Sequence, residues 1–328
     1  MNFVNRFIEQ AKLKRKTIVL PEGNDARIVA AARKLADDRI ATPILLGADD
    51  AVRTAAAEAN VSLDGLTVID PKRSDKLDAY VAAYIRGRDD ISEKVAHRLV
   101  SKPLYFGGMM LASGDADAYV GGAASATSSV IQAGALTVGY APGISTPSSF
   151  FLMIIPDFNG EKDKPFIYAD CAVNIQPTAS QLADIAIASA MSGSKLLSEP
   201  PRVALLSFST DGSASHPDVD KITEALHIVQ DHAPDIFIDG EFQADSAIVP
   251  RVAAKKVKHA SEVAGRANVL VFPDLDAGNV AYKLTQYMAN ARAIGPLLQG
   301  FAKPVSDLSR GATVEDIVAT SAILSVMC

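Results

Sequence analysis

Short apolar runs alternate along the chain with segments whose apolar residues recur at helical spacing, which is the pattern of a parallel sheet wrapped by helices. In the first half, residues 17–23 (TIVLPEG) read as a strand, and PILLG, LTVID and DAYVGG read as later strands. Asn24 or Asp25 is suited to cap the helix whose apolar positions begin at Ile28. A helix of small residues is expected from about residue 125 to residue 138.

The second half repeats the alternation with the apolar runs FFLMIIP, PFIYADCAV, RVALLSFST and ANVLVFP, separated by helical segments near residues 180–191, 219–232 and 278–291. Gly, Pro and Ser concentrate in residues 139–149, which favours a domain boundary there. A chain of 328 residues also exceeds the size at which one core keeps growing. We therefore predict an α/β protein of two domains, residues 1–142 with 297–328 and residues 143–296, although the pattern alone fits the final strand and helix to either domain.

Composition narrows the function classes. The formal charge of -6 disfavours a general nucleic-acid binder. No run approaches the ~18 apolar residues of a membrane span, and the first residues lack the apolar core of a signal peptide, so we expect a cytoplasmic protein without membrane contact. Cys171, Cys328 and the five histidines show no metal-ligand spacing, which predicts reduced thiols and no metal site.

The segment FAKPVSDLSRGATVEDIV near the C-terminus combines a hydroxyl (Ser309), a fixed cation (Arg310) and a flexible glycine with the start of a helix. Backbone N–H groups at a helix N-terminus attract anions, and an arginine adds a planar donor fork. We expect Thr313 to cap this helix, which places Asp316 at its third position, in the mouth of an anion site. The same T-x-x-D pattern also forms a capping box that needs no chemistry.

Three other segments suggest a site less strongly. LLSFSTDGSASHP places hydroxyls, among them Ser209, Thr210 and Ser213, after a strand; these suit phosphate oxygens, or they simply cap the next helix. In VFPDLDAGNVAYK, Asp276 or Asn279 is suited to cap a helix. GGAASATSS permits close backbone approach by a ligand, or tight helix packing. The fingerprints of ATPases, dinucleotide enzymes and serine hydrolases are missing from the sequence.

A family resemblance covers nearly the whole chain, from about residue 20 to the C-terminus. LPEGNDARI, YADCAVNIQPTASQLADIAI, RVALLSFSTDGS, IDGEFQADSA, GRANVLVFPDLDAGNVAYK and AIGPLLQGFAKPVSDLSRGATVEDIV together resemble the phosphate acetyltransferase family. The resemblance implies reversible acetyl transfer between coenzyme A (CoA) and inorganic phosphate. It also implies two α/β domains with the active site in the cleft between them, a fold like that of isocitrate and isopropylmalate dehydrogenases, and a homodimer.

The family's catalytic Ser, Arg and Asp match Ser309, Arg310 and Asp316, and its CoA-binding Arg matches Arg86. One departure is Gln132, which stands where the family commonly has an arginine for CoA. Thr127, at the start of the same helix, and Asn279 complete the expected substrate-binding set with Ser209, Thr210 and Ser213.

The implied chemistry fits these residues. Asp316 is placed to take the proton of the CoA thiol, and we expect it to be partly buried, because a desolvated carboxylate accepts a proton more readily. Arg310 neutralises the leaving phosphate, and Ser309 donates to the tetrahedral oxyanion. Direct transfer in a ternary complex then needs no metal and no permanently bound cofactor.

Three alternatives stay open at this stage. A phosphate butyryltransferase is the nearest alternative, because the preferred acyl length depends on the volume of the acyl pocket, which the sequence does not display. A non-catalytic acetyl-CoA sensor is disfavoured by retention of the three catalytic positions. A metal-dependent decarboxylating dehydrogenase of the same fold would need an Asp cluster and a nicotinamide site, and the sequence offers neither.

Overall fold

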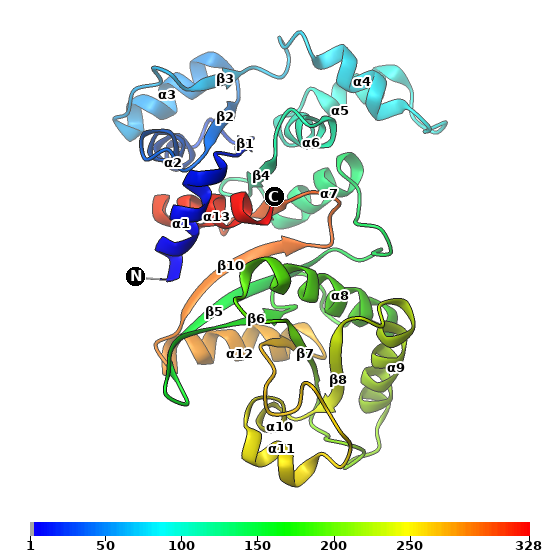
Figure 1. Cartoon of the computed structure of the whole chain (residues 1–328). Coiled ribbons are helices and arrows are strands. Elements are labelled where there is room, and N and C mark those ends of the chain that lie inside the picture. The colour runs from blue at the N-terminus through cyan, green and yellow to red at the C-terminus, as the bar shows by residue number, and fades with distance from the viewer. Residues whose placement is uncertain (1–2) are drawn as a thin grey trace. The chain divides into compact units, whose positions relative to one another are not determined.

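The computed structural model describes residues 3–328 and divides into two compact units (Figure 1). Unit 1 holds the chain up to Ala141 and from Phe301 to Cys328, and unit 2 holds Pro142–Gly300. The chain enters unit 2 at Pro142, next to the predicted start at residue 143, but it returns to unit 1 at Phe301 instead of residue 297. The reason is that β10 (Arg292–Gln299) is a strand of the sheet in unit 2.

Unit 1 is built on a five-stranded sheet in the order β11-β4-β1-β2-β3, in which all neighbouring strands are parallel. The strands are β1 (Thr17–Leu20), β2 (Thr42–Leu46), β3 (Thr67–Ile69), β4 (Ala118–Gly121) and β11 (Val305–Asp307). The helices are α1 (Phe3–Lys14), α2 (Ala26–Asp37), α3 (Asp49–Ala59), α4 (Leu77–Ile85), α5 (Glu93–Val100), α6 (Pro103–Ser113), α7 (Thr127–Thr137) and α13 (Val314–Met327). Residues 18–20 of β1 are fully buried, which explains why this strand reads as a continuous apolar run.

Helix α2 shows how the local sequence starts an element of this unit. Asp25 is the residue that caps it, since its side chain accepts a hydrogen bond from the Arg27 N–H. Ile28, Val29 and Leu35 recur on one face and are completely buried in the core of unit 1. The carboxyl end of β1 and the start of α2 therefore form one ordered corner.

Unit 2 contains a six-stranded sheet in the order β10-β5-β6-β9-β7-β8. The expectation of a wholly parallel sheet is wrong here, because β5 runs antiparallel to both β6 and β10. Besides β10, the strands are β5 (Ser148–Phe158), β6 (Glu161–Ala169), β7 (Arg202–Leu206), β8 (Phe237–Phe242) and β9 (Val269–Val271). The helices are α8 (Ala179–Leu196), α9 (Pro217–His232), α10 (Ala244–Ile248), α11 (Pro250–Lys256) and α12 (Leu275–Met288).

Strand β5 is covered on both of its faces. Helices α8 and α12 both pack on it, and Figure 1 shows them on opposite sides of the sheet. Helix α12 is capped by Asp274, whose carboxylate accepts from the Ala277 N–H at 2.8 Å, so the expected caps Asp276 and Asn279 are wrong. Asn279 instead lies in the second turn.

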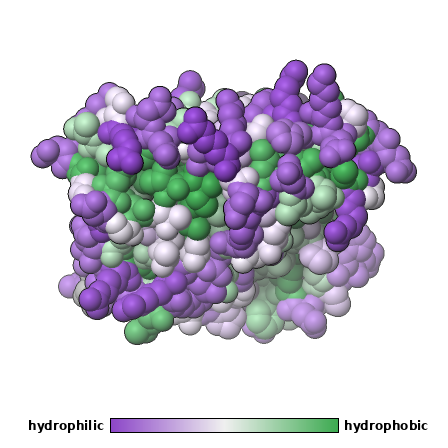
Figure 2. Space-filling model, turned by 90° about the horizontal axis from the view of Figure 1, so that it is seen from above, coloured by the Kyte–Doolittle hydropathy of each residue, from purple (hydrophilic) through white to green (hydrophobic). Residues whose placement is uncertain are grey.

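The outer surface is mixed in character. On the face seen in Figure 2, hydrophilic side chains cover most of the area, and hydrophobic side chains form patches between them. Within residues 3–328, no helix combines the length and the apolar character that crossing a membrane requires.

Candidate active site

The loop between β11 and α13 presents the hydroxyl and the cation that the sequence singled out. Ser309 and Arg310 are both exposed. The Ser309 hydroxyl oxygen accepts a hydrogen bond from the Gly311 N–H at 3.2 Å, and the Ser309 carbonyl accepts from the Ala312 N–H at 2.9 Å. The guanidinium of Arg310 has no hydrogen-bond or ion-pair partner among residues 3–328. A loop with an exposed hydroxyl and an unpaired guanidinium is suited to bind an anion.

The start of α13 forms the capping box that the T-x-x-D pattern indicates. The Asp316 carboxylate accepts from the Thr313 N–H at 3.0 Å and from the Thr313 hydroxyl at 2.8 Å, and that hydroxyl accepts from the Asp316 N–H. Asp316 is exposed, so the partial burial expected for a base is not found. Its capping role is observed, and its catalytic role stays a prediction.

A buried carboxylate supports the loop that leads to α7. Glu22 follows β1 and is only 4% exposed. Its oxygens accept from the N–H groups of Gly122 and Ala123, each at 2.8 Å, and of Ala124 at 3.1 Å. The three consecutive N–H groups compensate for the removal of the carboxylate from water, which fixes the path of the chain after β4.

A second buried carboxylate, Asp307, ends β11 and accepts from the hydroxyl of Thr127 at the start of α7. Its other oxygen has no hydrogen-bond partner among residues 3–328 and packs on Gly122, where a Cβ would lie 1.9 Å from it. Gly122 also has a φ of +103°, so a side chain is excluded twice over. Thr127 therefore joins the strand before the Ser309 loop to α7.

The pKa of Asp307 is raised to about 6, chiefly because burial disfavours the charged form, and the nearby Glu22 charge adds to the rise while the hydrogen bond from Thr127 opposes it. Since the unfolded pKa is about 3.9, folding takes up a proton between about pH 4 and pH 6. The stability that this proton contributes is complete at low pH and is lost as the pH rises through about 6.

We therefore expect Asp307→Asn, which does not titrate, to gain about 1 to 3 kcal/mol of unfolding free energy relative to the parent protein between about pH 4.5 and pH 7.5. Urea unfolding of both proteins at the two pH values measures this gain. An equal difference at both pH values would contradict the raised pKa of Asp307.

The residues expected to bind CoA are spread over separate helices of unit 1. Arg86 directly follows α4 and is exposed. Gln132 is exposed on α7, and its amide oxygen accepts from the hydroxyl of Tyr105 at 3.2 Å. Thr127 differs from these two, because its hydroxyl is linked by a hydrogen bond to the strand that carries the Ser309 loop.

The hydroxyl-rich loop of unit 2 binds mainly to itself and to the neighbouring strand end. Ser209 and Thr210 are buried, and Ser213 is exposed. The Ser209 hydroxyl donates to Glu241 at 2.7 Å, the Thr210 hydroxyl accepts from the Gln243 N–H at 2.9 Å, and the Ser213 hydroxyl accepts from the Thr210 N–H at 3.0 Å. These contacts favour the structural interpretation of the loop, and its role in substrate binding stays a prediction.

Asn279 is also engaged within unit 2. Its side-chain NH₂ donates to the Cys171 carbonyl at 3.1 Å, and its oxygen accepts from Lys283 at 2.7 Å. The contacts tie α12 to the segment after β6. A substrate contact of Asn279 stays a prediction.

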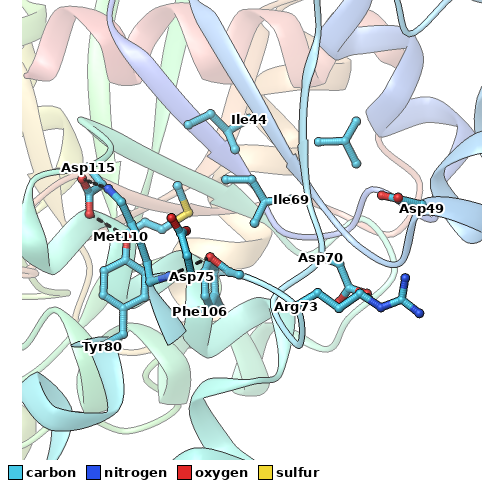
Figure 3. Close-up of a pocket in the computed structure, with 13 residues that line it drawn as sticks. Ile44, Asp49, Ile69, Asp70, Arg73, Asp75, Tyr80, Phe106, Met110 and Asp115 are labelled. Carbon is cyan, nitrogen blue, oxygen red and sulfur yellow. Dashed lines mark hydrogen bonds and ion pairs between the residues drawn. The ribbon is translucent and has the colours of Figure 1, made fainter. Parts of the chain in front are cut away.

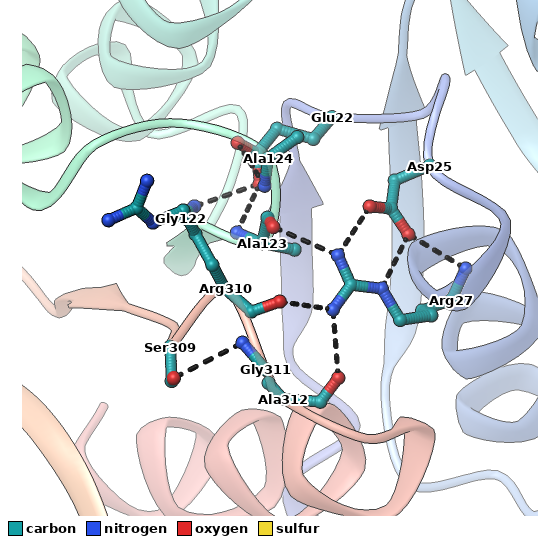
Figure 4. A network of polar contacts seen from close by, with 10 residues as sticks. All are labelled: Glu22, Asp25, Arg27, Gly122, Ala123, Ala124, Ser309, Arg310, Gly311 and Ala312. Carbon is teal, nitrogen blue, oxygen red and sulfur yellow. Dashed lines mark hydrogen bonds and ion pairs between the residues drawn. The ribbon is translucent and has the colours of Figure 1, made fainter.

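Arg27 is a residue of this corner that the sequence did not single out (Figure 4). Its guanidinium forms a two-point ion pair with Asp25 and donates to the carbonyls of Ala123 at 2.9 Å, Arg310 at 2.7 Å and Ala312 at 3.1 Å. The sequence signal that could have identified Arg27 is its position, since it follows the carboxyl end of a parallel strand, where open α/β sheets bind ligands.

Unit 1 also contains a pocket of about 480 Å³ near the ends of β2 and β3 (Figure 3). Its wall combines apolar side chains with a polar contact in which Asp115 accepts from Lys76 and, at 2.6 Å, from the Tyr80 hydroxyl. None of the residues expected at the active site lines this pocket. No group of acidic, His and Cys side chains suited to hold a metal ion occurs within residues 3–328.

Comparison with known proteins identifies the family. The sequence profile of the phosphate acetyl/butaryl transferase family matches residues 2–325. The chain belongs to this family. Curated relatives include the phosphate acetyltransferases of Acetivibrio thermocellus, 42% identical over 99% of this chain and 98% of that protein, and of Thermoanaerobacterium thermosaccharolyticum, 45% identical over 99% of each.

The fold is shared with a solved member of the family. The EutD phosphotransacetylase from Staphylococcus aureus superposes with a TM-score of 0.89 at 38% identity and covers 99% of this chain and 97% of its own. The predicted family membership and the predicted acyltransferase class are therefore confirmed, as is an α/β architecture with parallel strands.

Proposed function

We propose that this chain is a phosphate acetyltransferase, which moves an acetyl group reversibly between CoA and inorganic phosphate. The observation that carries the proposal is the exposed Ser309–Arg310 pair before α13, in a chain that aligns over nearly its full length with phosphate acetyltransferases. The names of these relatives favour acetyl over butyryl, and the exposed pair favours catalysis over a purely sensing role.

A direct assay tests this function. The purified protein is mixed with CoA and acetyl phosphate, and thioester absorbance is followed over time. We expect turnover, with a higher rate for acetyl phosphate than for propionyl or butyryl phosphate. A preference for the butyryl substrate would move the chain to the other branch of the family, and no thioester formation would overturn the proposal.

In the direction of acetyl-CoA, the CoA sulfur attacks the carbonyl carbon of acetyl phosphate. The C–S bond forms, the bond between that carbon and the bridging oxygen breaks, and phosphate leaves with the electron pair. Asp316 takes the thiol proton, and the Arg310 guanidinium stabilises the charge on the leaving phosphate. The Ser309 hydroxyl accepts from the Gly311 N–H, which leaves its own hydrogen available for the tetrahedral oxyanion.

We infer direct transfer in a ternary complex, without a covalent enzyme intermediate or a permanently bound cofactor. Cys171 is a poor nucleophile, because burial raises the pKa of its thiol well above the ordinary value and the nearby Asp170 adds to the rise. Initial-rate plots should therefore intersect. Parallel plots, or an acetylated residue trapped by mass spectrometry, would contradict direct transfer.

The proposal assigns CoA binding to Arg86, with Gln132 in a weaker role. Gln132 is exposed and donates no hydrogen bond within the described chain, so an arginine introduced there is free to reach a phosphate of CoA. We expect Gln132→Arg to lower the KM for CoA about 2- to 10-fold at low salt with kcat nearly unchanged, because a charged hydrogen bond contributes about 1.5 to 3 kcal/mol before solvent screening.

Salt separates the electrostatic effect from other causes, because exposed charges are screened beyond ~10 Å at about 0.1 M ionic strength. Most of the gain should disappear when KM is measured at high salt. An unchanged or raised KM at low salt would show that Gln132 does not face CoA, or that Arg86 already fills the role.

We also propose that the protein is a homodimer. Four large apolar side chains of α12 lie at helical spacing and are more than half exposed: Val280 at 54%, Leu284 at 52%, Tyr287 at 78% and Met288 at 79%. Such a stripe favours a protein interface. Light scattering of the parent protein and of Leu284→Glu should give a dimer and a monomer, respectively, and a monomeric parent would overturn the proposal.

The proposal also includes two family properties, a fold like that of isocitrate and isopropylmalate dehydrogenases and cytoplasmic localisation. Both rest on the family resemblance.

A further inference from the structure

Arg27 holds together two loops of unit 1, one that leads to expected active-site residues and one that carries them. One is the loop after β4, which leads into α7 with Thr127 and Gln132. The other is the loop after β11, which carries Ser309 and Arg310 (Figure 4). Arg27 itself lies on α2, which follows β1. Three strand ends of one sheet are therefore connected through a single guanidinium.

We propose that Arg27 is a positioning residue, whose guanidinium fixes the backbone of the Ser309–Ala312 loop so that the Arg310 side chain is held ready for the anionic substrate. The inference rests on the proposed acetyl transfer and adds a residue to it. Arg27 acts through the main-chain carbonyls of Arg310 and Ala312 and does not contact the substrate.

The middle of the loop has little other support. Ala312 at its end is buried in the core, but residues 309–311 are all exposed, so side-chain packing does not hold them. The hydrogen bonds within the loop span only residues 309 to 312 and leave the carbonyl of Arg310 to Arg27. A displacement of about 1 Å at a reacting group lowers turnover up to about 100-fold, so the anchor has a catalytic consequence.

The contact requires a guanidinium. One terminal nitrogen donates to the carbonyls of Arg310 and Ala312, and the other donates to Asp25 and to the carbonyl of Ala123. A lysine ammonium donates from one point and does not span acceptors in these directions. Burial alone would raise the pKa of Asp25, but hydrogen bonds from Arg27 lower it, so the carboxylate stays charged and orients the guanidinium.

The test compares Arg27→Lys with Arg33→Lys. Arg33 lies on the same helix, pairs with Asp37 and donates to the Asp64 carbonyl at 2.7 Å, away from both loops. We expect Arg27→Lys to lower kcat at least ~10-fold with the KM for CoA within about 3-fold of the parent value, and Arg33→Lys to keep the parent kinetics. A lower melting temperature with kcat within about 2-fold of the parent would overturn the inference.

Asp25→Asn provides a second variant if Arg27→Lys does not fold. Asparagine still caps α2, but it removes the charge that orients Arg27. We expect a kcat about 3- to 10-fold below that of the parent. A parent-like kcat in this variant would count against the proposed positioning.

Hydrogen exchange separates this inference from the proposed function. In Arg27→Lys, the amides of residues 309–312 should exchange at least ~5-fold faster than in the parent and in Arg33→Lys, whether or not acetyl transfer is detected. If the parent protein does not form acetyl-CoA, the proposed function is overturned. The exchange rates of residues 309–312 then still test whether Arg27 anchors the loop. Unchanged exchange in this loop would overturn the role of Arg27.

Discussion

Asp316→Asn is expected to lower kcat at least ~100-fold with little change in the KM for acetyl phosphate, the range typical of a lost general base. The carboxylate lies seven residues after Ser309 in sequence but in the first turn of the helix that this loop enters. One of its oxygens accepts both hydrogen bonds of the capping box. No hydrogen bond from residues 3–328 engages its other oxygen, which leaves that atom available to a thiol proton.

The substitution separates the two roles of Asp316 because asparagine retains one carbonyl oxygen. That oxygen still accepts from Thr313, so the loss of unfolding free energy should stay below about 1 kcal/mol. Thr178→Ala is a matched control, since Thr178 and Gln181 form the same kind of capping box at the start of α8. This control should lose about 1 kcal/mol of stability and keep its kcat.

Stopped-flow or steady-state rates and thermal melts of the three proteins decide between the roles. If Asp316→Asn turns over like the parent but melts earlier, the carboxylate is a helix cap and the base lies elsewhere.

The sequence predicted the parallel sheet of unit 1 well, because β1 and β4 are almost wholly buried and read as continuous apolar runs. It misjudged unit 2, where β5 is equally apolar because α8 and α12 cover both of its faces. Burial does not encode strand direction. The missed signal was the pair Asn159–Gly160 between β5 and β6, with φ values of 54° and 86°, which suits the two-residue turn of an antiparallel hairpin.

The sequence predicted the part of the candidate site whose residues lie close together along the chain. Ser309, Arg310, Thr313 and Asp316 lie within eight residues, so spacing alone placed the exposed loop and the capping box. Arg27 escaped detection because its contacts join positions far apart in sequence, and three of its acceptors are main-chain carbonyls that every residue has. Side-chain patterns carry no information about such acceptors.

Arg310→Lys is expected to lower kcat/KM for acetyl phosphate at least ~100-fold, comparable to the loss of a preorganised donor to a developing anion. Arg310 is exposed and its guanidinium has no partner among residues 3–328, so its planar donor fork is available to two phosphate oxygens at once. Lysine keeps the charge but offers only a point donor on a flexible stem, so the loss measures the geometry of the contact rather than its charge.

The structure makes this substitution specific. Arg27 binds the main-chain carbonyl of Arg310, which the exchange of side chains leaves in place, so the loop should keep its path. The stability of Arg310→Lys should accordingly stay within about 0.5 kcal/mol of the parent, as expected for an exposed site.

Arg53→Lys, at an exposed position of α3, serves as the control for a general effect of replacing arginine by lysine and should show parent kinetics. If Arg310→Lys keeps a kcat/KM within about 3-fold of the parent, charge alone suffices at this position. The proposed bidentate contact between Arg310 and phosphate would then be wrong. Turnover would also not depend on Arg27 holding the Arg310 side chain in one orientation.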